Sequence, residues 1–562
     1  MINAKVLTRL VLLLFGWWAL TPFALAAADA IFINGQVYTV NSQQPWAEAV
    51  VVEGHKILYV GDSEQAIRHQ SGGTRVIDLE GKMLLPGFID SHFHPSTAAL
   101  MLKLGVGMLE LNSKEEFLQA VRQYVSENPD VKVVSGFGWS QRAFGLEGPS
   151  KEDLDEIVSD RPVLLIERGG HSAWANSRTL DFLNINKDTP DPLPGKHFYV
   201  RDAQGNPTGW LQEGAAFWLH LEPLGIGTKE EFRQALLEFL PQLPQVGITS
   251  VFDAGTSGLQ EFALRALVEL DKEGKLPIRY NASNKIITHD DAEQAVRRLE
   301  RFQKEYSTEL VRPMANKIIN DGVAPDGGFT LMFEEPELTS IVTNIAVAGQ
   351  DLMIHVTKDV TVHEALNAME RARAVAGNRK SRFVLTHVDS VRPGDFVRFS
   401  EIGVMASIQP RRLGFEWNHE MHEWYKSGPL AGERSRLKTF LDKGVRLTLS
   451  SDFPACPGGL SNCTPLQGIE AAHTRQNLGM PDAPVVPPAD ERLTVEQAIR
   501  AYTIDNAYQM RMENELGSIE PGKLADLVVL EENLFEIEKH GIHKVQVLLT
   551  MMNGKIVFDV LE

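Results

Sequence analysis

The middle of the chain alternates between short apolar segments and helical stretches, and this alternation restricts the fold more than any other feature. Eight apolar segments each end in a polar residue or lie next to one, at 86–92, 248–253, 277–281, 316–320, 352–355, 383–387, 404–409 and 446–452. Helical stretches lie between most of them, such as L-Q-E-F-A-L-R-A-L-V-E-L from Leu259. Strands that alternate with helices form parallel sheets with right-handed crossovers. The pattern therefore predicts an α/β fold, a closed (β/α)8 barrel of the TIM type.

The two ends of the chain have a different texture. Residues 31–85 contain short alternating apolar segments broken by turn residues, and a similar texture returns after Gly517. Neither end is large enough to bury both faces of its strands, so we expect the two ends to pair into one small β-sandwich. The predicted order is a signal peptide at 1–27, the N-terminal segment of the sandwich at 28–85, the barrel at 86–511 and the C-terminal segment of the sandwich at 512–562.

One connection of the predicted barrel is far too long for a loop. It spans residues 96–245, approximately, and contains apolar segments of its own, such as R-P-V-L-L-I-E-R. A connection of this length in a compact domain forms a subdomain or a lid. Because it follows the first strand, we expect the insertion to overhang the face of the barrel where active sites lie.

Charge and the N-terminal segment restrict the partners. A formal net charge of -19 argues against nucleic acid or an anionic membrane surface as a partner. Lys5 and Arg9, the apolar run that follows and Ala-Leu-Ala at 24–26 form the pattern of a signal peptide. An uncleaved membrane anchor is the alternative, but Pro22 interrupts the run. We therefore expect cleavage and a periplasmic or secreted protein without a stable membrane anchor.

The chain has only two cysteines, Cys456 and Cys463. In an oxidising compartment they can close a small loop as a disulfide, and two unpaired thiols are the alternative. A thiolate metal site would need closer spacing and further cysteines. Neither cysteine is therefore expected to bind a metal.

Six side chains of metal-binding type lie at the ends of the predicted strands or within them. His92 and His94 stand two residues apart in L-L-P-G-F-I-D-S-H-F-H-P, so both imidazoles can reach one ion from a strand end. The later strands add Lys317, His355, His387 and Asp452. Each alone has an ordinary alternative, as a hydrogen-bonded histidine, a lysine extended to solvent or a capping aspartate. Their common place at the catalytic end of the barrel favours a metal centre.

These motifs resemble the metal-dependent amidohydrolase superfamily and, within it, the YtcJ-like group that includes N-substituted formamide deformylases. P-G-F-I-D-S-H-F-H is similar to the first-strand metal motif, N-K-I-I-N-D-G to the fourth-strand lysine motif and S-S-D-F-P to the eighth-strand aspartate motif. The I-H and T-H strands resemble the fifth and sixth. The inserted H-S-A-W-A-N-S and the C-terminal G-S-I-E-P-G-K-L-A-D-L-V-V-L extend the resemblance over essentially the whole mature chain.

The resemblance implies a centre with one or two divalent metal ions, with zinc as the expected metal. It divides the ligands into two sets, His92, His94 and Asp452 for one ion, and His355 and His387 for the other. Lys317 would bridge two ions if its amine is carboxylated, whereas an unmodified Lys317 predicts a single ion.

Two departures from the group's pattern concern the substrate pocket. The group usually has Gly-Asp after the fifth-strand histidine, where this chain reads H-V-T-K-D-V. It also usually has an acidic residue before the sixth-strand histidine, where Thr386 stands here. The ligands are unaffected, but the pocket is expected to differ from that of the group.

A centre of this kind predicts hydrolysis of a C–N bond of the amide or formamide type. A metal-activated hydroxide would attack the carbonyl carbon, and Asp452 is placed to carry the proton to the leaving amine. His171, in the insertion, is expected either to steady the carbonyl oxygen or bind substrate, or to be a structural histidine. Glu213 and Trp139 are weaker candidates for the pocket wall, and packing is the preferred role of the tryptophan.

Two other functions are left open by the sequence. The same metal site supports a deaminase or another carbonyl-centre hydrolase, and a non-catalytic binding or regulatory protein can keep this fold. Retention of the whole ligand set, Asp452 included, favours an enzyme. The expected partner is a small amide-like substrate, and a homodimer is one option for the assembly.

Overall fold

The computed structural model describes residues 28–561 except 146, 256–258, 324–328, 378–379, 415–429, 431–432 and 456–458. The predicted signal peptide and Cys456 therefore lie outside the described residues, whereas Cys463 is buried. Within these ranges, no helix combines the length and the apolar character needed to cross a membrane.

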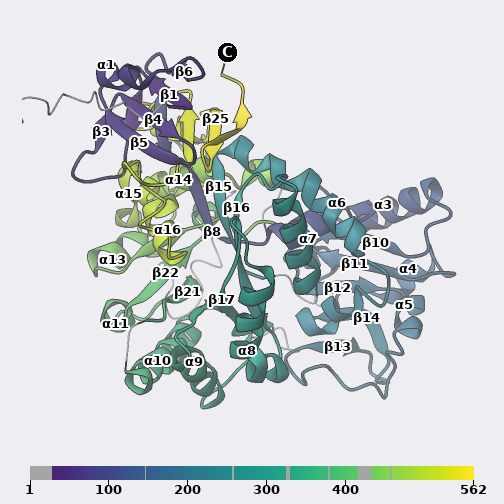
Figure 1. The fold of residues 1–562 in the computed structure, drawn as a ribbon. Coiled ribbons are helices and arrows are strands. Elements are labelled where there is room, and N and C mark those ends of the chain that lie inside the picture. The colour runs from purple at the N-terminus through teal and green to yellow at the C-terminus, as the bar shows by residue number, and fades with distance from the viewer. Residues whose placement is uncertain are drawn as a thin grey trace, which may run out of the picture.

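Eight parallel strands form the central sheet, in the order β23-β22-β21-β20-β17-β16-β15-β8. Their bounds are β8 Phe88–Phe93, β15 Ile248–Asp253, β16 Arg279–Ile286, β17 Val311–Ile319, β20 Asp351–Val356, β21 Phe383–His387, β22 Val404–Ile408 and β23 Leu447–Leu449. The two outermost strands meet just beyond β23, where the N–H of Asp452 donates to the carbonyl of His92 at 2.8 Å. The sheet is thus a nearly closed barrel, and the predicted (β/α)8 fold is confirmed (Figure 1).

Helices cover the outside of the barrel. They are α7 Gln260–Lys272, α8 His289–Tyr306, α9 Glu337–Val347, α10 Asp359–Ala376, α11 Asp395–Ile402, α13 Leu437–Asp442, α14 Pro465–Thr474, α15 Val495–Tyr502 and α16 Ile504–Gln509. Apolar strand residues such as Leu352 and Ile354 of β20 share one core with Ile341 of α9 and Leu366 of α10. The outer face of each barrel strand is buried in this way, which explains why the strands read as apolar runs.

Two small sheets lie together at one end of the barrel. Their orders are β5-β4-β1-β6 and β26-β25-β24-β7-β2-β3. The bounds are β1 Ala30–Ile33, β2 Gln36–Tyr38, β3 Trp46–Ala47, β4 Ala49–Glu53, β5 Lys56–Gly61, β6 Arg75–Asp78, β7 Met83–Pro86, β24 Leu527–Leu530, β25 Val547–Met552 and β26 Lys555–Asp559. Leu84 of β7 pairs with Val529 of β24, and both share a core with Phe32 and Val50. The two chain ends form the expected composite sandwich, while the exact domain limits stay predictions.

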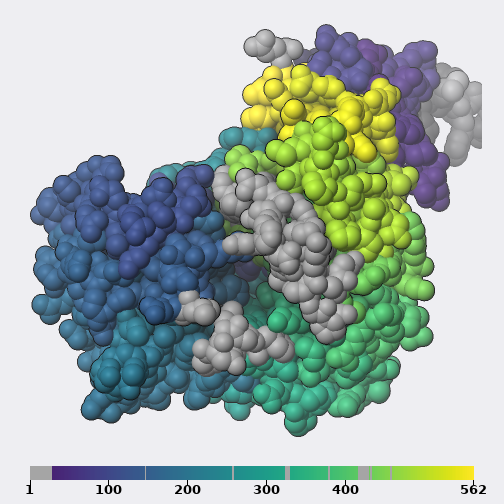
Figure 2. All heavy atoms as spheres, turned by 180° about the vertical axis from the view of Figure 1, so that it is seen from behind, coloured from purple at the N-terminus to yellow at the C-terminus, as the bar shows by residue number. Residues whose placement is uncertain are grey.

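The residues between β8 and β15 form a subdomain beside the barrel, with the sheet order β13-β14-β12-β11-β10-β9. Its elements are α2 Pro95–Met101, β9 Val106–Gly107, α3 Lys114–Glu127, β10 Val134–Trp139, α4 Lys151–Asp155, β11 Val163–Glu167, β12 Ser172–Ala175, α5 Ser177–Phe182, β13 Phe198–Arg201, β14 Pro207–Gln212 and α6 Lys229–Phe239. Figure 2 shows this lobe in blue next to the green region of the barrel. Trp139 is fully buried in the lobe, where its indole donates to the carbonyl of Leu165 at 2.9 Å.

Candidate metal centre

His92 and His94 meet Asp452 where the first and last barrel strands come together. The Nε2 atoms lie 3.2 Å (His92) and 3.5 Å (His94) from Oδ1 of Asp452. Asp452 follows β23 in a turn where its φ is +59°, an uncommon conformation for a residue other than glycine. Buried Asp90 accepts hydrogen bonds from the backbone N–H groups of His92 and Ser451, both at 3.1 Å. The carboxyl group of Asp90 therefore ties the histidine pair to the turn that carries Asp452.

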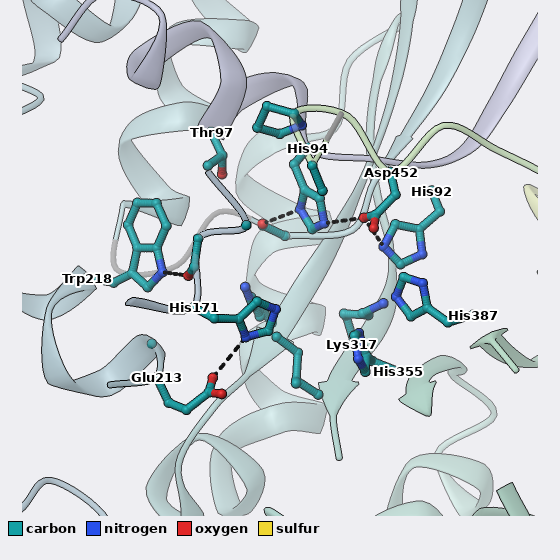
Figure 3. A pocket seen from close by; sticks show the side chains of 18 of the residues that line it. His92, His94, Thr97, His171, Glu213, Trp218, Lys317, His355, His387 and Asp452 are labelled. Carbon is teal, nitrogen blue, oxygen red and sulfur yellow. Dashed lines mark hydrogen bonds and ion pairs between the residues drawn. The ribbon is translucent and has the colours of Figure 1, made fainter. Parts of the chain in front are cut away.

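The other predicted ligands converge on the same place. Ligand atoms of His92, His387 and Asp452 all lie within 4.8 Å of one another. The rings of His355 and His387 have their centroids 4.1 Å apart. Lys317 extends from β17 toward these rings (Figure 3). All six side chains predicted as ligands line one cavity at the C-terminal ends of the strands.

Each imidazole is oriented by a partner outside the centre. The hydrogen bonds are His92 Nδ1 with Thr386 Oγ1 at 2.7 Å, His94 Nδ1 with the Gly255 carbonyl at 3.1 Å and His387 Nδ1 with Gln409 Oε1 at 2.6 Å. Nε2 of His355 lies 3.1 Å from Oδ1 of Asp321. A partner on one ring nitrogen fixes the ring and leaves the other nitrogen for a ligand. This arrangement is the usual outer shell of a histidine metal site.

Burial sets the protonation of the centre. It lowers the pKa of His92 and His387 well below the usual value, so both imidazoles are neutral. It also lowers the pKa of Lys317 well below that of an ordinary amine. Asp452 is different, because hydrogen bonding with His92 and His94 holds its pKa well below the usual range in spite of burial. Neutral imidazoles and an ionised carboxylate are the forms that bind metals.

Two nitrogens of this group are buried without a hydrogen-bond partner among the described residues. They are Nε2 of His387 and Nζ of Lys317. Leaving such groups unsatisfied costs roughly 1–3 kcal/mol each, unless a ligand satisfies them. Nitrogen and carboxylate donors around one point fit a zinc-type divalent ion.

The far wall of the cavity, which has a volume of about 260 Å³, comes partly from the insertion. Nδ1 of His171 donates to Oε2 of Glu213 at 3.0 Å. The carboxylate of Glu213 raises the pKa of His171 to about 9. The ring of His171 faces His355, with centroids 6.4 Å apart (Figure 3). A protonated imidazole therefore lies opposite the candidate ligands.

The sequence of residues 75–558 matches the amidohydrolase family over most of the chain. The chain belongs to the amidohydrolase family. The resemblance seen in its motifs is thereby confirmed, and this amidohydrolase is a metal-dependent hydrolase of carbon–nitrogen bonds.

Relatives of this amidohydrolase match it along nearly their whole length. The N-substituted formamide deformylase of Arthrobacter pascens is 28% identical over 94% of this chain and 98% of its own. The putative amidohydrolase YtcJ of Bacillus subtilis is 28% identical over 94% and 99%. A solved structure of an uncharacterized metal-dependent hydrolase from Pyrococcus furiosus is 27% identical, with a TM-score of 0.64 over 90% of this chain and 99% of its own.

Lys285 is a pocket residue that the sequence interpretation missed. The third strand was expected to end at 281, but β16 continues to Ile286 and brings Lys285 into the cavity. Gly255 makes room for it, since a Cβ at that position would lie 2.8 Å from the Lys285 side chain. Burial lowers the pKa of Lys285 to about 8.

Asp321 and Gln409, which orient His355 and His387, were also missed. Asp321 directly follows the fourth-strand segment and also accepts from the N–H of Thr357 at 2.6 Å. Gln409 ends the seventh predicted segment. Both stand where polar residues follow apolar strands, which is the signal that identified the ligands themselves.

Proposed function

We propose that this amidohydrolase is an exported hydrolase of a small amide or formamide that uses a zinc-type centre. The observation that carries the proposal is the convergence of six ligand-type side chains on one cavity, with His171 on the opposite wall. The formamide deformylase relative supports the amide class of substrate.

We infer the following ligands. His92, His94 and Asp452 would hold one ion and His355 and His387 a second, while a carboxylated Lys317 would link the two sets. A divalent ion there would supply the Lewis acidity that activates a water and polarises a carbonyl group.

Asp452 moves the proton. Its low pKa keeps it ionised at neutral pH, so it can accept the proton of the attacking water and pass it to the leaving nitrogen. Its Oδ1 lies 3.2 and 3.5 Å from Nε2 of His92 and His94, and the turn that carries it is tied to β8 by the N–H of Asp452, which donates to the carbonyl of His92 at 2.8 Å. Its position is therefore fixed before substrate binds.

His171 stabilises the developing negative charge. Glu213 keeps its imidazole protonated, so the other ring nitrogen can donate to the carbonyl oxygen of the substrate. Trp218 supports the same segment, because its indole donates to the carbonyl of Gly170 at 3.2 Å. The insertion thus supplies His171 and Glu213 to the wall of the cavity opposite the ligands from the barrel.

The decisive experiment combines metal analysis with one substitution. Asp452→Asn should lower kcat on a panel of N-substituted formamides and N-acyl amines by roughly 10²- to 10⁴-fold. Asp442→Asn, at an exposed position of α13, is the matched control. Hydrolysis by metal-replete Asp452→Asn at the wild-type rate would refute the mechanism. Ammonia release from amino-substituted heterocycles would favour a deaminase, and no turnover at all would favour a binding or regulatory protein.

Export and assembly have separate tests. Cleavage of the segment ending near Ala26 to Ala28 should be visible as the first residue of the mature protein in N-terminal sequencing. A protein that keeps Met1 in the membrane fraction would instead be anchored. Light scattering of the mature protein decides between a monomer and the homodimer.

A further inference from the structure

Arg411 lies in the cavity wall next to the turn of Asp452. It belongs to the 3-10 turn η7, Pro410–Leu413, which follows β22. One of its terminal nitrogens donates to the carbonyl of Ala455. Its Nε is buried and has no hydrogen-bond partner among the residues that the structure describes. A portion of the guanidinium fork is therefore left for another acceptor.

The other arginines of the same wall have more protein partners. Arg412 forms an ion pair with Asp389 at 2.7 Å. Arg168 also has a buried Nε without a partner among the described residues, but its terminal nitrogen donates to three backbone carbonyls, at 3.2 to 3.5 Å. Arg411 forms no ion pair with a described carboxylate, although burial is strong enough to lower its pKa to about 10. Retaining an unpaired buried charge is unfavourable unless a partner arrives.

The charges that line the cavity are mostly positive. Apart from Lys317, whose amine is neutral, the basic side chains are Arg168, Lys285, Arg411 and Arg412, and the acidic ones are Glu213 and Asp452. The chain as a whole carries a formal net charge of -19, so the cavity differs in sign from the molecule. A concave site with an excess of one charge concentrates ligands of the opposite charge.

We propose that Arg411 binds a carboxylate of the substrate, so that this amidohydrolase acts on N-acyl compounds with a carboxylate close to the scissile bond. The inference rests on the proposed amide hydrolysis. The guanidinium holds Ala455, whose N–H donates to the carbonyl of Asp452 at 2.9 Å. This short turn connects Arg411 to Asp452, the proposed proton carrier. A substrate carboxylate bound by Arg411 is therefore placed near the scissile C–N bond. A planar fork with an open N–H suits the two oxygens of a carboxylate.

The test uses two probes that differ only in charge. 4-Oxopentanoate has the shape of an N-acetylated amino acid with CH2 in place of the amide NH, and hexane-2,5-dione, with CH3 in place of the charged oxygen, is its neutral partner. Neither contains an amide or ester bond, so calorimetry on the metal-loaded mature enzyme measures binding without turnover. The wild type should bind the acid about tenfold more tightly or better, as expected for charge-assisted hydrogen bonds.

Substitutions assign the preference to one side chain. Arg411→Gln should bring the two affinities together, and Arg411→Lys should keep some of the preference because the charge remains. Arg297→Gln, at an exposed position of α8, is the matched control and should behave as the wild type. Metal content is measured for each variant, so that loss of the centre is recognised.

Two results would overturn the proposal. One is equal affinity of the wild type for the acid and the neutral diketone. The other is a preference for the acid that persists in Arg411→Gln, which would mean that the carboxylate binds elsewhere in the cavity. Failure of the enzyme to hydrolyse any amide would count against the proposed function alone, since the affinity ratio still decides the role of Arg411.

Discussion

The Nε2 atom of His92 lies 3.2 Å from Oδ1 of Asp452, so the first and last strands of the barrel meet at one carboxylate. The ring of His92 is aimed there by its other nitrogen, which bonds Thr386 Oγ1 at 2.7 Å. Gln409 in turn donates to the same hydroxyl at 3.4 Å. Thr386, one of the positions where the sequence departs from the pattern expected of the group, therefore orients a predicted ligand through its hydroxyl.

Thr386→Val should weaken the metal centre without removing a ligand. Valine keeps the shape of threonine but cannot bond Nδ1 of His92, so the ring is no longer fixed. Loss of such an outer partner typically lowers metal affinity about 10- to 100-fold. Competition with a chromophoric chelator measures the change. Thr249→Val on β15, whose hydroxyl reaches the Phe88 carbonyl only at 3.5 Å, is the control. Equal affinities in the two variants would contradict the role of Thr386.

Glu213→Gln should move the alkaline limit of activity. In the wild type the pKa of His171 is raised to about 9 by the charge of Glu213, so the imidazole stays protonated through neutral pH. The substitution removes that charge, and the pKa should fall toward 6.5. Profiles of kcat/KM against pH should therefore lose activity on the alkaline side at lower pH. Glu222→Gln, an exposed position of the insertion, should leave the profile unchanged.

The same pair affects stability with a definite sign. A histidine whose pKa is higher in the folded protein stabilises it fully below the unfolded value of about 6.5. This stabilisation is lost as pH rises through about 9. Glu213→Gln should therefore lower the unfolding midpoint at pH 6 more than at pH 10. An equal shift at both values would mean that the pair does not titrate as described.

The barrel was predictable from the sequence because each of its strands is a short buried segment of the chain. The segments at 383–387 and 248–253 contain several apolar residues and end in a polar one, and the structure has fully buried strands with these same limits. The third strand was set too short because N-A-S-N-K follows Tyr280, and this run is polar. In the structure these polar residues are buried on opposite faces of the strand. Lys285 lines the cavity, whereas Asn284 faces helix α8 and donates to the carbonyl of Ala295 at 3.0 Å and to Asn316 at 2.8 Å. Because the paired side chains are polar, this segment lacks the apolar pattern that would predict a strand.

The sequence predicted which strands carry the ligands of the candidate site. It did not predict the contacts that orient those ligands. Chain order puts His355 and His387 at the same end of a parallel sheet, so their meeting follows from topology. The bonds that orient them depend on side chains of other elements, such as Asp321 for His355. The face that His171 presents to the centre depends on how the insertion packs on the barrel. Tertiary contacts of this kind join residues far apart in the chain, so no periodic sequence pattern predicts them.

Lys317 should react with carbon dioxide if it bridges two ions. Its lowered pKa makes the amine neutral and nucleophilic, so it can add to CO2 and release one proton, giving a carbamate with two ligand oxygens. Wild-type protein loaded with metal in bicarbonate should bind two ions per chain, and Lys317→Met only one. Labelled bicarbonate should give a carbamate carbon resonance in the wild type. Lys285→Met replaces another cavity lysine of lowered pKa and should keep that resonance. A resonance that survives in Lys317→Met would place the carbamate elsewhere.

Asp526→Ala should loosen the sandwich from the barrel. Arg279, at the start of β16, lies 3.3 Å from Asp526, which precedes β24, and the two side chains are 3% and 4% exposed. Asp526 also accepts from the N–H of Asn553 at 2.8 Å, so one carboxylate connects the barrel with the turn between β25 and β26 of the sandwich. Removing one partner of a buried ion pair typically costs about 3–5 kcal/mol, because the other charge stays buried.

The shift of the urea unfolding midpoint measures this loss, with an exposed pair as the control. Asp559 pairs with Arg75 at 2.6 Å inside the sandwich, where the two side chains are 24% and 52% exposed. An exposed pair contributes at most about 1 kcal/mol, so Asp559→Ala should shift the midpoint little. If Asp526→Ala shifts it no further than the control, the buried pair does not hold the two domains together. If the sandwich melts first in Asp526→Ala but together with the barrel in the wild type, this carboxylate is what makes the two domains unfold as one unit.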